Sequence, residues 1–370
     1  MDSRSISGRQ ANPSHRPHRP LGYNLSVTSG FASADATARF VARFGLAHDH
    51  GFYREFHNLG ISSLGLGTYL GNMDDATDRA YHQAVVAAVR GGINFLDTAI
   101  NYRHQRSERS IGSALAELFH AGDTRRDELV IATKGGFLTP DAVPSFLKAS
   151  EIVGNMHSMQ PEFIADQIDR SRANLGLDTL DVFYLHNPET QLGFVSREQF
   201  EHRIRLSFVK LEELVAAGKI RYYGTATWQG FRQPSGARDA LDLARFAEFA
   251  VAVGGAGHHF RFIQLPVNLA MPEALTNGVL DTAAQSGIAV VASASLLQAR
   301  LARDLPPALA EKFPGLSTDA QRAIQFTRST PGVTAALVGM RQAAHVDENL
   351  QLAAVPPMAP EAYQDLFQRA

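Results

Sequence analysis

Four polar side chains stand just after short apolar runs, where the end of a strand is expected. Asp97 follows the run INFL, and Tyr102 comes five residues later. Lys134 follows LVIAT, and His186 follows DVFYL. A phenol can give its proton to a carbonyl oxygen while a hydride donor attacks the carbon. A nearby lysine favours the phenolate and lowers the phenol pKa, a carboxylate holds the lysine charge in place, and an imidazole hydrogen-bonds to the carbonyl oxygen.

The elements that would position these groups follow a repeat. From Ser63 onward, eight apolar runs alternate with longer amphipathic stretches, at 63–67, 93–96, 128–133, 181–185, 220–224, 261–265, 288–293 and 335–339. Strands that are apolar along their whole length, with helices between them, are typical of a parallel sheet covered on its outside. Eight such units predict an α/β fold of the (β/α)8 TIM-barrel type, in which active-site residues lie at the C-terminal ends of the strands.

The chain divides into three predicted parts. Residues 1–22 are polar and predict a flexible tail. Residues 23–62 predict an N-terminal extension, with ASADATARFVARFG as one helix and YREFHNLGIS as a hairpin that plugs the barrel floor. Residues 63–370 form the predicted barrel. Two long connections, 135–160 and 187–200, are expected to shape the pocket, the first as an ordered loop over the site.

Composition excludes several classes of function. The 370 residues include no cysteine, which rules out disulfides, thiolate catalysis and cysteine-ligated metal. The net charge of −2 argues against nucleic acid or a membrane surface as a bulk partner. No apolar run approaches the length of a membrane span. We therefore expect a cytoplasmic protein that acts on a small molecule without a metal, while its oligomeric state cannot be read from the sequence.

Several segments, in order and at suitable spacing, resemble the aldo-keto reductase family over about residues 55–355. LGLGTY resembles the family's first-strand motif, and GGINFLDTAINY with Glu108 and Gly112 resembles its DTAxxYxxExxxG signature. TKGGF, DVFYLHNPE and LEELVAAGKIRYYGTATW are similar to three later segments. The resemblance implies an NADPH-dependent oxidoreductase that reduces an aldehyde or ketone. It also implies Tyr102 as general acid, Asp97 and Lys134 as its tuners, and His186 as the group that orients the carbonyl.

The same resemblance implies a site for NADP(H), with NAD(H) as the alternative. Its expected contacts are Thr68, Tyr69, Asp97, Thr227, Gln264, Leu296, Arg341, Glu348 and Asn349, with Arg341 as the partner of the 2′-phosphate. Residues 226, 227 and 293 depart from the family pattern, and His345 stands where many members carry Arg. The Ser-Asn pair that holds the nicotinamide carboxamide reads Ala226-Thr227, and Ser293 stands where many members place an aromatic ring.

The substrate pocket is predicted to include Tyr69, Trp228 and Phe231. Two other functions stay open. The departures at Ala226 and Ser293 favour a non-catalytic barrel that holds NADP(H) as a sensor or scaffold. Alternatively, Lys134 would serve as the Schiff-base lysine of an aldolase, because lysines on barrel strands take that role.

Overall fold

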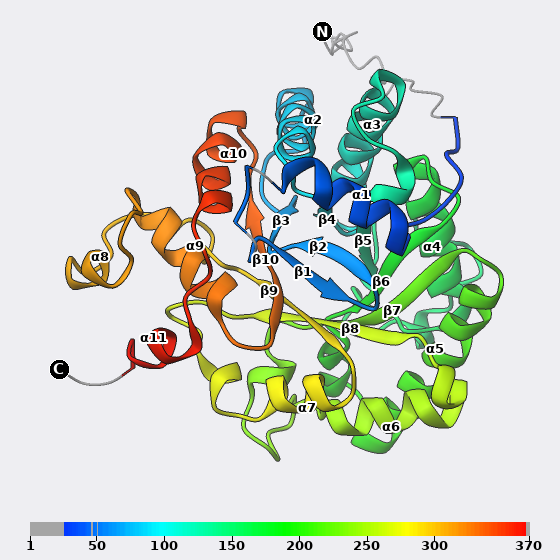
Figure 1. Cartoon of the computed structure of the whole chain (residues 1–370). Coiled ribbons are helices and arrows are strands. Elements are labelled where there is room, and N and C mark those ends of the chain that lie inside the picture. Colours follow the sequence, from blue (N-terminus) through cyan, green and yellow to red (C-terminus); the bar gives the residue numbers. More distant parts are fainter. Residues whose placement is uncertain (1–25, 46, 50, 368–370) are drawn as a thin grey trace, which may run out of the picture.

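The chain folds into a closed barrel of eight parallel strands ringed by helices (Figure 1). The computed structural model describes residues 26–45, 47–49 and 51–367. Around the barrel the strands follow the order β10-β3-β4-β5-β6-β7-β8-β9, so each pairs with its neighbours in sequence and the last closes on the first. The predicted (β/α)8 fold is confirmed. The predicted tail, residues 1–22, lies outside the described residues.

Each of the eight apolar runs is a barrel strand. They are β3 (Leu64–Gly67), β4 (Phe95–Asp97), β5 (Val130–Gly135), β6 (Leu180–His186), β7 (Ile220–Ala226), β8 (Phe260–Pro266), β9 (Ala289–Ser293) and β10 (Val333–Gly339). The helices that follow the barrel strands β3 to β8, one after each strand, are α2 (Asp75–Arg90), α3 (Arg106–Ala121), α4 (Pro161–Leu175), α5 (Arg197–Ala216), α6 (Leu243–Gly254) and α7 (Val279–Gln285). Those nearer the C-terminus are α8 (Ala308–Lys312), α9 (Asp319–Ser329), α10 (Ala343–Leu350) and α11 (Pro360–Gln364).

One helix is shorter than its amphipathic pattern predicts. The stretch ARDALDLARFAEFAVAVG suggests a helix from residue 237, whereas α6 begins at Leu243. Asp242 has extended backbone angles, and its side chain accepts a hydrogen bond from the Arg245 amide. This N-cap satisfies one of the amides that a helix start leaves free, and it fixes the start at that residue.

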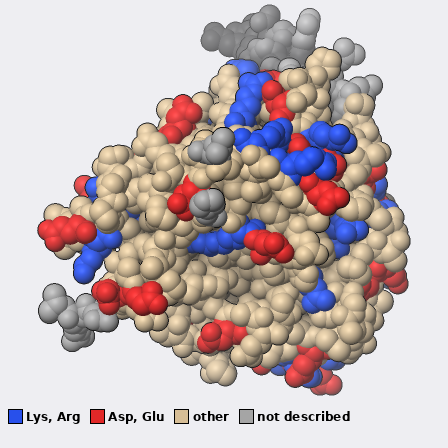
Figure 2. Space-filling model, in the orientation of Figure 1, with Lys and Arg blue, Asp and Glu red and all other residues tan. Residues whose placement is uncertain are grey.

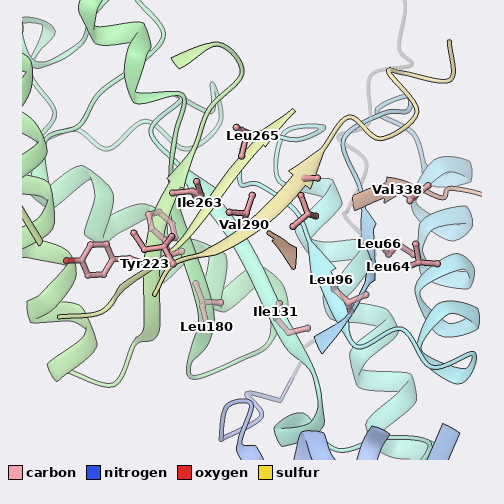
Figure 3. Close-up of a cluster of buried hydrophobic side chains, with 14 of the residues drawn as sticks. Leu64, Leu66, Leu96, Ile131, Leu180, Tyr223, Ile263, Leu265, Val290 and Val338 are labelled. Atoms are coloured by element: carbon pink, nitrogen blue, oxygen red, sulfur yellow. The ribbon is translucent and has the colours of Figure 1, made fainter. Parts of the chain in front are cut away.

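Side chains of the strands alternate between two buried clusters. Leu66, Ile131 and Val290 point outward into the larger cluster, which also contains residues of the surrounding helices (Figure 3). Phe95 and Tyr184 belong to the second cluster, which fills the barrel interior. Because side chains of a strand alternate between its two faces, every second residue belongs to the interior. The barrel is therefore packed with side chains up to the layer in which the polar groups begin.

The predicted helix and hairpin before the barrel are both present. α1 (Ala34–Phe44) starts at the N-cap Ser33, and β1 (Tyr53–Phe56) pairs antiparallel with β2 (Leu59–Ser62). Leu59 and Ile61 join the interior cluster of the barrel. Ser62 donates its amide hydrogen to the side chain of Asn94, just before β4. The hairpin thus covers the end of the barrel at which the strands begin, as Figure 1 shows.

The surface on the hairpin side carries acidic and basic side chains close together (Figure 2). This agrees with the small net charge of −2. Among the described residues, no helix is long and apolar enough to cross a bilayer. The cytoplasmic location stays a prediction.

A close approach between β7 and β8 allows a test of the barrel geometry. A Cβ atom on Gly224 would lie 1.9 Å from the carbonyl oxygen of Phe262, which is backbone and has little room to move. We expect Gly224→Ala to lower the free energy of unfolding by at least about 1–3 kcal/mol, measured by chemical denaturation. Gly257→Ala is the control, since no atom lies within 4 Å of its added carbon. Equal denaturation midpoints for the two variants would contradict this geometry.

Candidate active site

The polar groups predicted for catalysis form one layer at the end of the barrel interior. Asp97 comes two residues after the inward-facing Phe95, and His186 comes two residues after the inward-facing Tyr184. Lys134 lies opposite Tyr184 in the register of β5 and β6. The two-residue period of each strand therefore directs these side chains into the same interior space, at the C-terminal ends of β4, β5 and β6.

Lys134 and Asp97 form a buried ion pair. The ammonium group donates to Asp97 Oδ1 and also to the carbonyl oxygen of Thr98, at 2.7 Å. Asp97 Oδ2 accepts a second hydrogen bond, from Gln264 Nε2 at 2.9 Å. Burial raises the pKa of Asp97 and lowers the pKa of Lys134, while the attraction between the two opposes both shifts. The position of the ion pair is thus fixed by hydrogen bonds between residues of β4, β5 and β8 and the residue that follows β4.

The Tyr102 ring lies against this pair and against His186. The Lys134 nitrogen is 5.1 Å from the centre of the phenol ring, and the His186 ring centre is 5.7 Å away at a steep angle. Burial raises the pKa of Tyr102 well above its usual range, and the Asp97 carboxylate adds to this shift. Burial and the Asp97 carboxylate thus oppose the lowering of the Tyr102 pKa that a nearby lysine alone would cause.

A hydrogen-bond network that the sequence did not reveal holds the main chain at His186. His157, from the long loop after β5, donates Nε2–H to the main-chain oxygen of His186 at 2.8 Å. Its Nδ1 accepts from the Gln191 side chain at 2.8 Å, and Gln191 in turn accepts from Arg203. These two bonds require the neutral imidazole, and burial lowers the pKa of His157 to about 4. No spacing in the sequence links these segments, so the motifs could not have shown this network.

A pocket of about 520 Å³ opens above the polar layer. Its lining includes Asp97, Tyr102 and His186, together with the predicted substrate contacts Tyr69 and Trp228. Phe137 is the residue of the 135–160 connection that lines it, and Asn187 is the residue of the 187–200 connection. The structure does not bring Phe231 to this pocket. Its ring is buried and packs against Phe246 of α6, 6.1 Å between ring centres.

Several of the predicted cofactor contacts line the same pocket, namely Thr68, Tyr69, Asp97, Thr227, Gln264 and Leu296. Thr68 is held by a hydrogen bond to Thr98 at 2.9 Å. The Thr227 hydroxyl donates to Glu189 at 2.7 Å and accepts from the Gly230 amide at 2.6 Å. Thr227 is therefore positioned by the protein before any ligand binds. The sequence had not indicated Glu189, which also accepts from the amides that follow Thr227.

The other three predicted cofactor residues lie outside the pocket, beyond the end of β10. The Arg341 side chain is exposed, has no ion-pair partner among the described residues, and reaches the loop at Gly71. Glu348 accepts from the Thr318 hydroxyl at 2.7 Å. The Oδ1 atom of Asn349 is buried without a hydrogen-bond partner in the described part of the chain. An unpaired cation and an unsatisfied amide oxygen are suitable contacts for a phosphate and an adenine amine.

The neutral state of His157 leads to a pH-dependent stability. Its folded pKa of about 4 lies below the ordinary value of 6.5, so the unfolded chain binds more protons between these values. The stability that depends on neutral His157 is therefore fully present above pH 6.5 and is lost as the pH falls toward 4.

His157→Gln keeps a donor for the His186 carbonyl but does not titrate, so its unfolding free energy should fall less steeply over this range. Urea denaturation at several pH values measures this, with the exposed His120→Gln as control. Parallel curves for wild type and His157→Gln would count against a buried neutral His157.

Comparison with known proteins identifies the family to which the chain is similar. The profile of the aldo/keto reductase family matches residues 63–367. The chain is 26% identical over 332 residues to a probable voltage-gated potassium channel subunit beta of Arabidopsis thaliana, covering 82% of this chain and 92% of that relative. It is 26% identical over 282 residues to a 6-dehydroglucose reductase of Novosphingobium aromaticivorans, covering 72% and 78% of the two chains.

A solved structure shares the fold. It is an aldo/keto reductase from Klebsiella pneumoniae in complex with NADP and acetate, with a TM-score of 0.61 and 21% identity, and the match covers 85% of this chain and 94% of that one. The family match spans almost the whole barrel and includes all four of the polar groups at the strand ends. The chain therefore belongs to the aldo/keto reductase family, and the prediction of an oxidoreductase of this type is confirmed.

Proposed function

We propose that the protein reduces an aldehyde or ketone to an alcohol with NADPH, and that Tyr102 is the general acid. The observation that carries this proposal is the position of the Tyr102 ring between Lys134 and His186 at the base of the pocket. The bound NADP of the Klebsiella pneumoniae relative supports the choice of cofactor. The described residues fit that group, because Gln264 and Thr227 bring an amide and a hydroxyl to the pocket, and the exposed Arg341, beyond the end of β10, has no ion-pair partner among the described residues.

Each residue of the layer then has its own task. Tyr102 stays protonated in the buried site, and it gives its proton to the carbonyl oxygen as that oxygen gains charge. His186 is held neutral, because burial and the nearby Lys134 lower its pKa well below its usual value. A neutral imidazole keeps one N–H with which to orient the carbonyl oxygen. NADPH, when bound, supplies the hydride to the carbonyl carbon.

Lys134 acts through its charge rather than as a nucleophile. Its nitrogen is bonded to Asp97 and to the Thr98 carbonyl, and Lys134 is not among the residues that line the pocket. A Schiff-base lysine must reach the substrate carbonyl and lose its proton. The position of Lys134 therefore argues against the alternative function of an aldolase that forms a Schiff base with this lysine.

The acid is tested by Tyr102→Phe, which removes the phenolic proton and keeps the ring. We expect carbonyl-dependent NADPH oxidation to fall by about 10²–10⁴-fold, while NADPH binding measured by fluorescence is retained. Tyr222→Phe is the matched control, since that phenol lies next to Phe262 and His57, away from the pocket. Unchanged turnover in Tyr102→Phe would remove Tyr102 from the role of acid.

The choice of cofactor is tested at Arg341. Charge-assisted hydrogen bonds contribute about 1.5–3 kcal/mol, so Arg341→Ala should raise the dissociation constant for NADPH about 10- to 100-fold and change that for NADH little. Arg79→Ala, another exposed arginine without an ion pair among the described residues, should affect neither. Equal weakening for both cofactors would show that Arg341 does not contact a 2′-phosphate.

A second candidate function is a barrel that holds NADP(H) without turnover, as a sensor or scaffold. The similarity to the potassium channel subunit beta favours it, together with the changes at Ala226 and Ser293. A single-turnover experiment with bound NADPH and a panel of carbonyl compounds separates the two functions. Oxidation of the bound cofactor supports the reductase, and a cofactor that binds but is not oxidised by any of them supports the scaffold.

A further inference from the structure

The turn that follows Tyr102 lies in the left-handed region of backbone conformation. Arg103, His104 and Gln105 have φ angles of 50°, 51° and 66°, and α3 begins directly after them. A residue with a Cβ atom is disfavoured roughly 5- to 30-fold in this region relative to the right-handed one, and glycine is the exception. Three such residues in succession persist only where their surroundings hold them. This turn must therefore be fixed by contacts with neighbouring segments.

Arg103 ties one side of the turn to the preceding βα unit. Its side chain is buried, and Nε donates to the main-chain oxygen of Asn72 at 2.7 Å. Nη2 donates to the main-chain oxygen of Asp74 at 3.2 Å and forms an ion pair with Asp78. Asn72 and Asp74 lie in the loop between β3 and α2, and Asp78 lies in the first turn of α2. One buried guanidinium group thus joins the turn to both.

Gln105 ties the other side of the turn to the next βα unit. Its buried side chain donates to Asp141 Oδ2 at 3.1 Å and accepts from Asn174 Nδ2 at 3.0 Å. Asp141 belongs to the long connection after β5, and Asn174 belongs to α4. The left-handed turn is therefore held between the units on either side of β4.

The position of the Tyr102 phenol depends on this turn. No described residue forms a hydrogen bond with the Tyr102 hydroxyl, and the ring is in contact with the exposed Tyr69 and with His186, at 5.0 and 5.7 Å between ring centres. The direction of the hydroxyl is therefore set by the backbone at residue 102 and by the packing of the ring. A misplacement of about 1 Å lowers the rate of a reaction by about 10²-fold, so this backbone has to be fixed.

We propose that Arg103 is a positioning residue for the reduction, because it holds the left-handed turn and so keeps the Tyr102 hydroxyl directed at the substrate carbonyl. The inference rests on the proposed role of Tyr102 as the acid. Arg103 is not among the residues that line the pocket, so it acts through Tyr102 and does not touch the reacting atoms. The reaction is unchanged: NADPH gives a hydride to the carbonyl carbon, and Tyr102 gives a proton to its oxygen.

Two substitutions separate the anchor from the backbone strain. Arg103→Ala removes the anchor and keeps a Cβ atom that disfavours the left-handed turn, whereas Arg103→Gly removes both. The readout is the rate at which bound NADPH is oxidised in a single turnover with 4-nitrobenzaldehyde, an uncharged and reactive aldehyde. We expect Arg103→Ala to lower this rate about 10- to 100-fold and Arg103→Gly to be at least about fivefold faster than Arg103→Ala. The dissociation constant of NADPH, measured by fluorescence, should stay the same.

A second background shows whether the effect passes through Tyr102. In Tyr102→Phe no hydroxyl has to be directed, so adding Arg103→Ala or Arg103→Gly should not lower the remaining rate further. An arginine that only stabilises the fold would lower the rate equally in both backgrounds or not at all. If Arg103→Ala does not fold, Arg103→Gly in the two backgrounds carries the test, with a lower rate expected only where Tyr102 is present.

Arg126→Ala is the matched control. Arg126 is also buried, donates to the main-chain oxygens of Leu129 and Thr179, and pairs with Asp181. It precedes β5, at the end of the barrel away from the pocket. Arg126→Ala should therefore lower the free energy of unfolding, as Arg103→Ala does, without slowing the oxidation of NADPH.

The outcomes separate this inference from the function on which it rests. The role of Arg103 is overturned, and Tyr102 remains the acid, if Arg103→Ala leaves the rate unchanged, if Arg103→Gly is no faster than Arg103→Ala, or if the loss is equal in the Tyr102→Phe background. A rate that Tyr102→Phe alone does not lower would remove the acid and the positioning role together. If NADPH binds and neither this aldehyde nor any other carbonyl compound oxidises it, the reductase fails as well.

Discussion

The buried ion pair between Lys134 and Asp97 is the interaction on which the site depends. Each charge would be costly to bury alone, and the pair is tolerated because the Thr98 carbonyl and Gln264 each add a further hydrogen bond to it. The closed barrel makes this arrangement rigid, since the two residues come from adjacent strands in fixed register. The Tyr102 ring and the pocket floor are placed by packing against this pair. Removing either charge would leave the other buried without a charged partner.

The pair also explains the state of the phenol. A lysine that already faces a carboxylate presents little net charge to Tyr102, so burial dominates and the phenol stays protonated. In the proposed reduction, this phenol would give its proton to the carbonyl oxygen as charge develops there. In the proposed reduction, the charge of Lys134 would act mainly in the transition state, where it would stabilise the phenolate that remains.

Much of the fold was readable because each strand is apolar throughout and each helix is amphipathic. The four polar residues could be grouped from the sequence, since the ends of parallel strands meet on one face of a barrel. Contacts between distant segments could not be read. His157 reaches the His186 carbonyl across a long loop whose path no motif specifies. Phe231 lies three residues after Trp228, yet the turn between them directs its ring into the helical layer against Phe246.

The residues proposed to hold the nicotinamide carboxamide differ from the family pattern, and their hydrogen bonds limit the contacts that they can still offer. The Thr227 hydroxyl hydrogen is used by Glu189, and its oxygen already accepts from the Gly230 amide. Thr227 therefore retains one acceptor lone pair and no donor. Ala226 supplies neither, so a carboxamide oxygen must find its donor elsewhere. Gln264 lies opposite Ala226 in the register of β7 and β8, and one of its amide hydrogens is bonded to Asp97. A carboxamide bound by the other hydrogen would be linked through Gln264 to the Lys134–Asp97 pair, so cofactor binding and the acid's supporting charge would share one residue.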